Sequence, residues 1–213
     1  MALSRVQWGD AGSSYVASGS AGTVLPANVT VGDGVSLLFF VGAGSANTIS
    51  AVTSPMGTTL TRVNSYVQSS GIQEIECWVL AQASAAAKTV TVTTVGSVNW
   101  TCAGTEWNLP ITGSDGGLGS GSSTAPSKGI SVVSGQAAVA FMFEASGGVI
   151  TAAPTSPWTD YNGADAFWSW TDALDFAYQV AGSTGTLTAT WTTSPSGAWD
   201  VAGLIVADAQ VAP

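Results

Sequence analysis

The chain has 213 residues and a net charge of −9, and only 8% of its residues are charged, about a third of the ~25% usual in globular domains. Glycine, serine, threonine and alanine take the place of the missing charges, which predicts a polar but nearly uncharged surface. The 4 basic residues form no cluster against the 13 acidic ones, so we expect neither nucleic acid nor an anionic membrane as a partner. Histidine is absent, which removes every Ser-His or Cys-His catalytic pair.

The first 23 residues contain two short predicted strands, at 5–8 and 14–17, among glycine and serine. They carry no apolar signal-peptide core, and no apolar run of membrane length follows. We therefore expect a protein made in the cytoplasm without a signal peptide. Because these residues precede the repeated part of the chain, we interpret 1–23 as an N-terminal arm that docks on a neighbour, with Arg5 and Trp8 as contact candidates.

A nearly continuous apolar run at 35–41 lies between two glycine-rich turns, which is the pattern of a strand buried on both faces. About one hundred residues later the run at 137–143 repeats it. The two runs predict equivalent central strands in two halves of the chain.

Further pairs of similar segments occur in the same order in the two halves. The segment 49–55 resembles 150–157, where Pro154 is inserted, 78–81 resembles 178–181, and 89–94 resembles 188–193. Trp100 to Gly104 resembles Trp199 to Gly203. We therefore predict an all-β, jelly-roll-like β-sandwich built from two internally repeated halves, each contributing strands to both sheets. A single domain at 24–208 would hold halves at about 24–111 and 129–208 and a flexible Gly/Ser connection at 112–128, and a tail at 209–213 would follow the domain.

Alternation along 89–94 and 186–192 places threonines on the solvent face of a half-buried strand, with Ala189 and Trp191 facing inward. The two cysteines, Cys77 and Cys102, lie in predicted strands and are interpreted as small buried hydrophobic residues, although a cross-strand disulfide stays open.

The carboxylates Glu74 and Glu76 share one face of a strand, and with Glu144 they are the candidates for an acid-dependent hydrolase. Two carboxylates on one strand more often form a solvated or edge-protecting face. We therefore predict that the chain is not an enzyme and has no catalytic residue.

The segment 158–176 is both acidic and aromatic. Its carboxylates, Asp160, Asp165, Asp172 and Asp175, could ligate Ca²⁺ through oxygen, although their spacing is not that of an EF-hand; we expect no resident cofactor and hold calcium as the alternative. Its aromatic residues, Trp158, Phe167, Trp168 and Trp170, either cap the sandwich core, contact another protein, or stack on sugars.

The run Leu25-Pro26-Ala27, the strand 77–80, the Thr-Val ladder and the segment 202–206 resemble a Gly/Thr-rich β-sandwich family of structural proteins in tailed actinobacterial phages. The resemblance covers residues 24–208 and carries no catalytic residue. It implies a component of the virion surface, of the capsid decoration or minor tail type.

We therefore expect a non-enzymatic capsid decoration protein. It would pack on the major capsid protein and form a homo-oligomer, with a trimeric ring as the expected form. The alternatives are a minor tail or fibre protein, which would contact tail components, and a carbohydrate-binding module that uses the Trp-rich loop.

Overall fold

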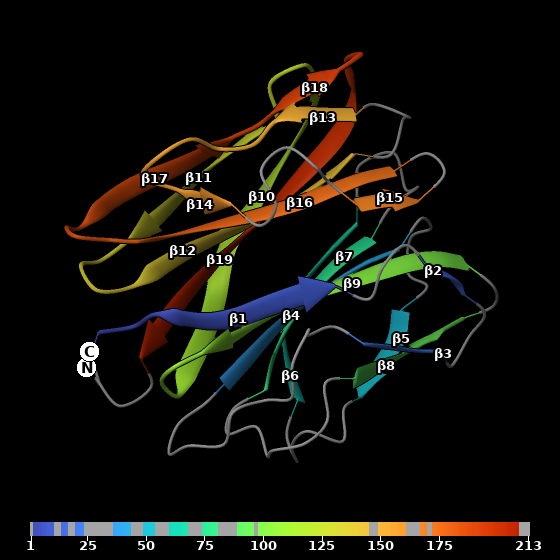
Figure 1. The fold of residues 1–213 in the computed structure, drawn as a ribbon, viewed down its shortest axis with the longest axis horizontal. Coiled ribbons are helices and arrows are strands. Elements are labelled where there is room, and N and C mark those ends of the chain that lie inside the picture. The colour runs from blue at the N-terminus through green and yellow to red at the C-terminus, as the bar shows by residue number, and fades with distance from the viewer. Residues whose placement is uncertain are drawn as a thin grey trace. The chain divides into compact units, whose positions relative to one another are not determined.

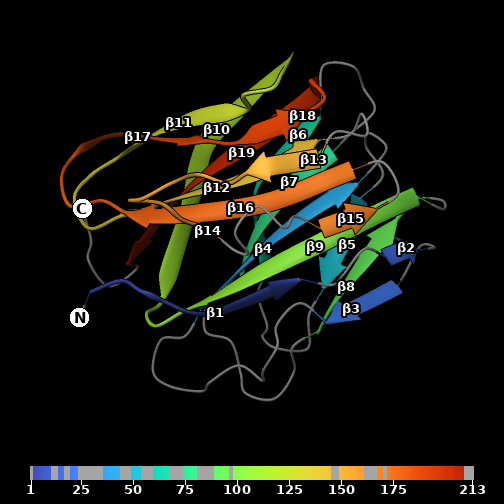
Figure 2. The ribbon, with the colours of Figure 1, turned by 45° about the horizontal axis from the view of Figure 1, so that its top comes forward.

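The structure is a computed structural model that describes residues 2–10, 14–16, 20–23, 36–43, 49–53, 60–67, 74–80, 89–95, 98–144, 149–160, 167–169 and 172–208. The fold is all-β, and its strands pair antiparallel (Figures 1 and 2). Among these residues no helix could cross a membrane. The chain divides into two compact units, one formed by 1–113 with 207–213 and the other by 114–206.

The first half of the chain forms two sheets. The larger has the order β1-β9-β4-β7-β6, with β2 also on β9, and the smaller has the order β3-β8-β5. Their strands are β1 (Arg5–Asp10), β2 (Ser14–Val16), β3 (Ser20–Thr23), β4 (Ser36–Ala43), β5 (Ile49–Thr53), β6 (Leu60–Val67), β7 (Glu74–Leu80), β8 (Thr89–Thr94) and β9 (Val98–Trp107).

The second half forms a sheet of order β10-β19-β12-β16-β14, with β15 also on β16, and two strand pairs, β11-β17 and β13-β18. Their strands are β10 (Ile111–Ser123), β11 (Ser127–Val132), β12 (Ala137–Glu144), β13 (Val149–Ala152), β14 (Thr159–Asp160), β15 (Phe167–Ser169), β16 (Asp172–Val180), β17 (Gly185–Thr190), β18 (Thr192–Ser194) and β19 (Gly197–Asp208).

Each sheet takes all its described strands from one half of the chain. The sequence predicted that each half would contribute strands to both of two common sheets, and for the described strands this is wrong. Consecutive strands here find their partners within the same half, which is the usual preference for short connections.

The pairings of the two larger sheets correspond at a constant spacing. Leu37 lies opposite Leu80 between β4 and β7, and the same positions one hundred residues later, Ala137 and Val180, are opposite each other between β12 and β16. The pairing of β4 with β9 likewise recurs one hundred residues later as the pairing of β12 with β19. The strand order β9-β4-β7 therefore recurs as β19-β12-β16 with the same register.

One of the sequence similarities between the two halves does not agree with the register of the strands. Trp100 lies opposite Ala43, whereas the position one hundred residues later, opposite Phe143, is occupied by Asp200 and not by Trp199. Matching the two tryptophans was therefore wrong by one residue. Register matters for such a comparison, because a shift of one residue exchanges the two faces of a strand.

The described residues of the segment 1–23 form strands of the sheets and not a separate arm. Arg5 lies opposite Trp107, Ser14 lies opposite Trp100 and Ser20 lies opposite Val92, so β1, β2 and β3 are strands of the first two sheets. The side chain of Asn108 holds the start of the chain by accepting from the Ser4 N–H at 2.8 Å and donating to the Ala2 carbonyl at 3.0 Å. Short strands with little apolar content are ordered here by pairing with β9 and β8.

The apolar run at 137–143 forms β12, and all its residues are buried, which confirms a strand buried on both faces. Ala140 and Met142 belong to a core cluster with Trp158, Trp191 and Val201. The run predicted at 35–41 is found as β4, whose side chains lie outside the described ones.

The Gly/Ser-rich segment 112–128 is not a flexible connection, because it forms most of β10 and the start of β11. Glycine allows this strand to approach its neighbour closely. A Cβ added at Gly116 would lie 2.8 Å from the carbonyl carbon of Gly203 in β19. The absence of side chains, which suggested a loop, is here a requirement of strand packing.

The substitution Gly116→Ala should lower the free energy of unfolding by about 1–3 kcal/mol, because the methyl group meets backbone atoms that cannot move aside. Gly185→Ala is the matched control, since a Cβ there meets no atom within 4 Å. Urea unfolding of both variants checks this. Equal effects of the two substitutions would contradict close packing at Gly116.

Candidate functional site

The structure separates the aromatic residues singled out in the sequence. Trp158 is 8% exposed and belongs to the core cluster, in agreement with a core cap. Phe167 and Trp168 lie in β15 opposite Leu174 and Ala173, but their side chains are not among the described ones. Trp170 lies outside the described residues, so its sugar-stacking role stays a prediction.

The two candidates near the N-terminus lie in β1, where Arg5 is half-buried. Trp8 lies opposite Thr105 of β9, and its side chain is not described. Arg5 and Trp8 therefore belong to a sheet and not to a separate arm, and their role as contacts with a neighbour stays a prediction.

The four aspartates proposed for calcium do not form a cluster in the described residues, which contain no group of three metal-ligating side chains. Asp160 lies in β14 and Asp172 in β16, while Asp165 lies outside the described residues. Asp175 is buried, and its carboxylate is already engaged.

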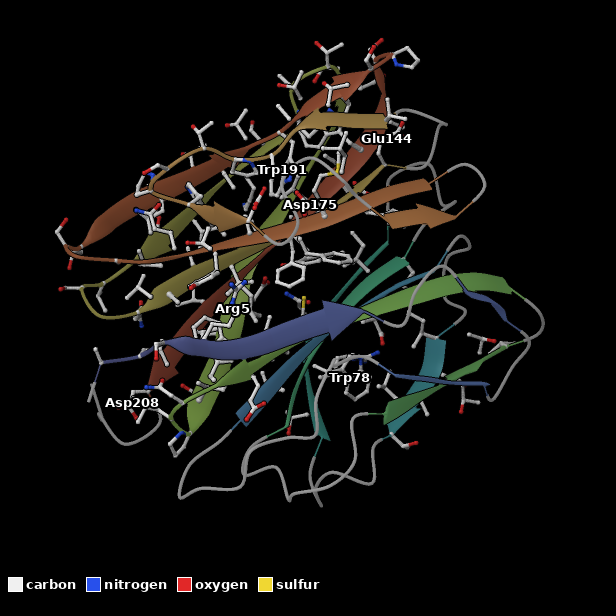
Figure 3. All side chains as sticks on the ribbon, viewed as in Figure 1. Arg5, Trp78, Glu144, Asp175, Trp191 and Asp208 are labelled. Atoms are coloured by element: carbon white, nitrogen blue, oxygen red, sulfur yellow. The ribbon has the colours of Figure 1, made fainter. Side chains whose placement is uncertain are left out.

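Asp175 sits opposite Met142 on the core face of its sheet (Figure 3). Its carboxylate accepts a hydrogen bond from the Trp191 indole at 2.7 Å and another from the Phe176 backbone N–H at 2.8 Å. The pKa of Asp175 is raised to about 7, because burial, together with the charge of nearby Asp160, outweighs the lowering effect of the hydrogen bonds from Trp191 and Phe176.

Asp200 is a second buried carboxyl group, 1% exposed, and lies opposite Phe143. Its Oδ1 atom has no hydrogen-bond partner within the described part of the chain. Desolvation raises the pKa of Asp200 to about 6. Both groups are therefore partly protonated near neutral pH, and both belong to the interior.

The hydrolase candidates Glu74 and Glu76 are 3% and 0% exposed, so the predicted solvated face is wrong. Glu74 accepts from the Ile49 backbone N–H at 3.1 Å. Glu76 forms an ion pair with Arg62 at 2.7 Å and accepts from the Trp78 indole at 3.0 Å. These bonds tie β7 to β5 and β6, which explains why charges are tolerated there.

Burial raises the pKa of Glu76 despite the Arg62 charge and the two hydrogen bonds to its carboxylate. Glu144, the third hydrolase candidate, is 0% exposed at the end of β12 (Figure 3). A glycosidase needs two carboxyl groups facing each other across an open cleft. Glu74, Glu76 and Glu144 are closed off from a substrate instead.

Arg62→Ala should destabilise the first unit by about 1–2 kcal/mol at pH 8, because it removes the positive charge that neutralises buried Glu76. The loss is smaller than for a fully buried pair, since the Arg62 side chain is 51% exposed. At acidic pH, where Glu76 is protonated, the variant and the parent should converge. Urea titrations at both pH values test this, and an equal loss at both would contradict the ion-pair explanation.

Cys77 is fully buried, which agrees with its interpretation as a small hydrophobic residue. Cys102 lies opposite Val41, and its side chain is not described.

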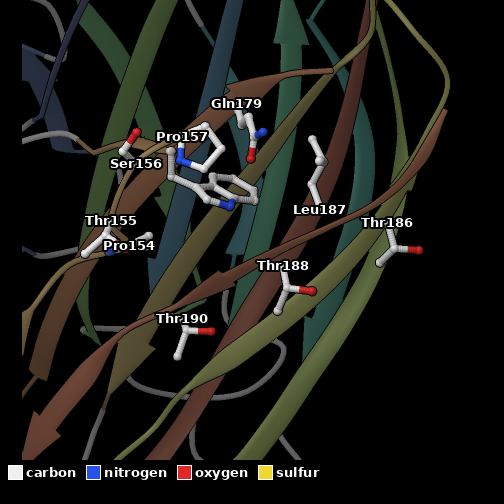
Figure 4. A pocket seen from close by; sticks show the side chains of 10 residues that line it. Pro154, Thr155, Ser156, Pro157, Gln179, Thr186, Leu187, Thr188 and Thr190 are labelled. Atoms are coloured by element: carbon white, nitrogen blue, oxygen red, sulfur yellow. The ribbon is translucent and has the colours of Figure 1, made fainter. Parts of the chain in front are cut away.

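A pocket of about 350 Å³ opens in the second unit between residues 154–158 and β17 (Figure 4). In the first unit the pairing of β5 with β8 continues to Thr53 opposite Thr91. In the second unit the matching ladder stops at Ala152 opposite Thr192, and Pro154 follows. Proline has no N–H to continue a ladder, so the chain separates from its partner strand β18 before Pro154, and the pocket lies between this segment and β17.

The pocket is lined on one side by Thr186, Thr188 and Thr190 of β17 and on the other by Ser156, Trp158 and Gln179. The three threonines are exposed while Ala189 and Trp191 are buried, which confirms the alternation predicted for this strand. None of the ten lining residues is charged. The Pro154 insertion and the threonine row were visible in the sequence, but the sequence did not show that they lie beside each other. No sequence pattern pointed to Gln179.

No protein-family model matches the chain, and no curated protein or solved structure does either. Its function must therefore be argued from its own residues.

Proposed function

We propose that the chain is a non-enzymatic structural protein on the surface of a tailed-phage particle, where it decorates the capsid. The observation that carries the proposal is a charge-poor, hydroxyl-rich β fold whose buried carboxylates Glu74, Glu76 and Asp175 are engaged by neighbouring groups of the fold. A decoration protein needs rigidity and an extended contact surface, and it needs no reactive group. The sequence resemblance over 24–208 supports the same class.

We further infer that the chain is built from two repeats of one jelly-roll-like unit. The support is the shared order β9-β4-β7 and β19-β12-β16 together with the constant spacing of one hundred residues in both pairings. A register is specified by the burial of one face, so two unrelated sheets have no reason to agree in it. The differences between the repeats are then the places where partner-specific contacts would have arisen.

The assembly would be a closed homo-oligomeric ring, with three copies as the expected number, because symmetric shells present symmetric docking positions. The major capsid protein is the proposed partner. The low charge of the chain favours docking by shape and hydrogen bonding over electrostatic steering.

The proposal is tested by quantitative mass spectrometry of purified particles separated into heads and tails. We expect the chain in the head fraction at a copy number comparable to that of the major capsid protein. Its presence at a few copies in the tail fraction would replace decoration by a minor tail role. Its absence from both fractions would refute a virion role altogether.

A further inference from the structure

We propose that the pocket beside β17 is a binding site for a small neutral saccharide. The pocket is concave and has a volume of about 350 Å³, near the lower end of the ~300–1,000 Å³ typical of ligand sites. It lies wholly in the second unit, between 154–158 and the edge of β17 (Figure 4). The proposal does not depend on docking on a capsid.

The polar groups in the pocket wall are available to a ligand. Within the described part of the chain, the side chains of Gln179, Thr188 and Thr190 make no hydrogen bond. The same holds for the indole N–H of Trp158. Thr188 and Thr190 are exposed and Gln179 is half-buried, so a hydroxylated ligand can reach these side chains and exchange hydrogen bonds with them.

The apolar part of the wall suits the carbon face of a sugar ring. Pro154, Pro157 and Leu187 line the pocket together with the indole of Trp158. Saccharides present C–H groups on their faces and hydroxyl groups around their edges, and a wall that alternates apolar and hydroxyl surfaces matches both.

The charge of the pocket selects against acidic ligands. Among the described residues that line the pocket, none is basic or acidic, and the chain as a whole carries a net charge of −9. An anionic sugar would lose hydration without gaining a cation. Neutral hexoses, N-acetylhexosamines and their disaccharides are therefore the expected class.

The neighbouring strand β11 pairs along the whole of β17 and fixes the backbone that carries the threonines. Ser131 and Thr186 lie opposite each other, and their hydroxyl groups are 3.2 Å apart. On the other wall, the Trp158 backbone N–H donates to the Thr155 carbonyl at 3.2 Å and closes the turn that carries the prolines. Both walls are thus fixed before a ligand arrives, which limits the entropy lost on binding.

The test is an NMR titration of the full ¹⁵N-labelled chain with glucose, galactose, mannose, N-acetylglucosamine and two of their disaccharides, and with glucuronate as the acidic arm. We expect at least one neutral sugar to shift the Trp158 indole and Gln179 amide signals saturably, and glucuronate to leave them unchanged. No saturable shift with any neutral sugar, or tighter binding of glucuronate, would overturn the proposal.

Substitutions then separate the pocket from the rest of the threonine row. Thr188→Val and Gln179→Ala should each weaken binding about fivefold, the loss expected for one hydrogen bond. Thr192→Val is the matched control, because Thr192 is exposed in the next strand but does not line the pocket, and it should leave the affinity unchanged. An equal loss in Thr192→Val would overturn the proposal. So would pocket signals that shift with protein concentration alone, since a second copy would then occupy the edge of β17.

Discussion

The second unit should lose stability as the pH rises from about 4 to about 7. An unfolded aspartate releases its proton near its ordinary pKa of 3.8, whereas folded Asp175 keeps it up to a pKa of about 7. The folded state therefore binds more protons than the unfolded state in this window, and its free energy of unfolding falls with pH. The stabilisation is complete below pH 3.8 and is lost as the pH passes through 7. A rise of about three pKa units corresponds to roughly 4 kcal/mol.

Native-state amide hydrogen exchange in β12 and β16 measures this, because it reports the stability of the second unit separately from that of the first. Asp175→Asn should remove most of the slope while keeping an acceptor for the Trp191 indole. A smaller slope should remain up to about pH 6 from Asp200, whose pKa is raised to about 6 by desolvation. A slope unchanged in Asp175→Asn would show that Asp175 is ionised in the fold.

Trp191→Ala should lower the free energy of unfolding of the second unit by about 3–5 kcal/mol, the range for removing a buried aromatic side chain. Trp191 is 1% exposed in the core cluster, and its indole donates to the buried carboxyl group of Asp175. The substitution thus opens a cavity and also leaves Asp175 without its side-chain donor.

Trp191→Phe separates the two effects, since it keeps most of the ring volume and loses only the N–H donor. We expect a loss of about 1–2 kcal/mol at neutral pH and an upward shift of the Asp175 pKa, seen as a later end of the pH slope. Exchange rates in β12 and β16 again give both values. A phenylalanine variant as unstable as the alanine variant would mean that packing volume contributes little at this position.

The sequence predicted the elements whose side chains alternate or are uniformly apolar. β12 was predicted from a continuous apolar run and is buried throughout. Along β17 the inward position of Ala189 and the outward threonines were also predicted, because a period of two residues is itself the signature of a half-buried strand.

The elements that the sequence could not predict are those specified by their partners. β1, β2 and β3 are short and poor in apolar residues, and β10 is rich in glycine. Local composition suggests an arm and a loop for these segments. Pairing with β9, β8 and β19 decides otherwise, because strand formation depends more on neighbours than on intrinsic preference.

The candidate site shows the same division. Pro154 was visible in the sequence as an insertion, and the threonines of β17 were visible as a row. Only the structure shows that the β13–β18 ladder ends before Pro154 and that the threonines of β17 line the pocket formed there. The sequence showed the carboxylates as charged groups, but it did not show that they are buried. Glu76 lies in a strand of alternating pattern that suggests a solvated face, and only the neighbouring Arg62 and Trp78 explain its place in the interior.

The proposed role on the capsid is tested most directly by reconstitution. Particles assembled without this chain are mixed with the purified protein, and bound copies are counted after sedimentation and by cryo-electron microscopy of the heads. The decoration account predicts saturable binding at regular, symmetry-related positions on the shell. Particles that bind no copies on the head, while still carrying every other capsid component, would contradict it.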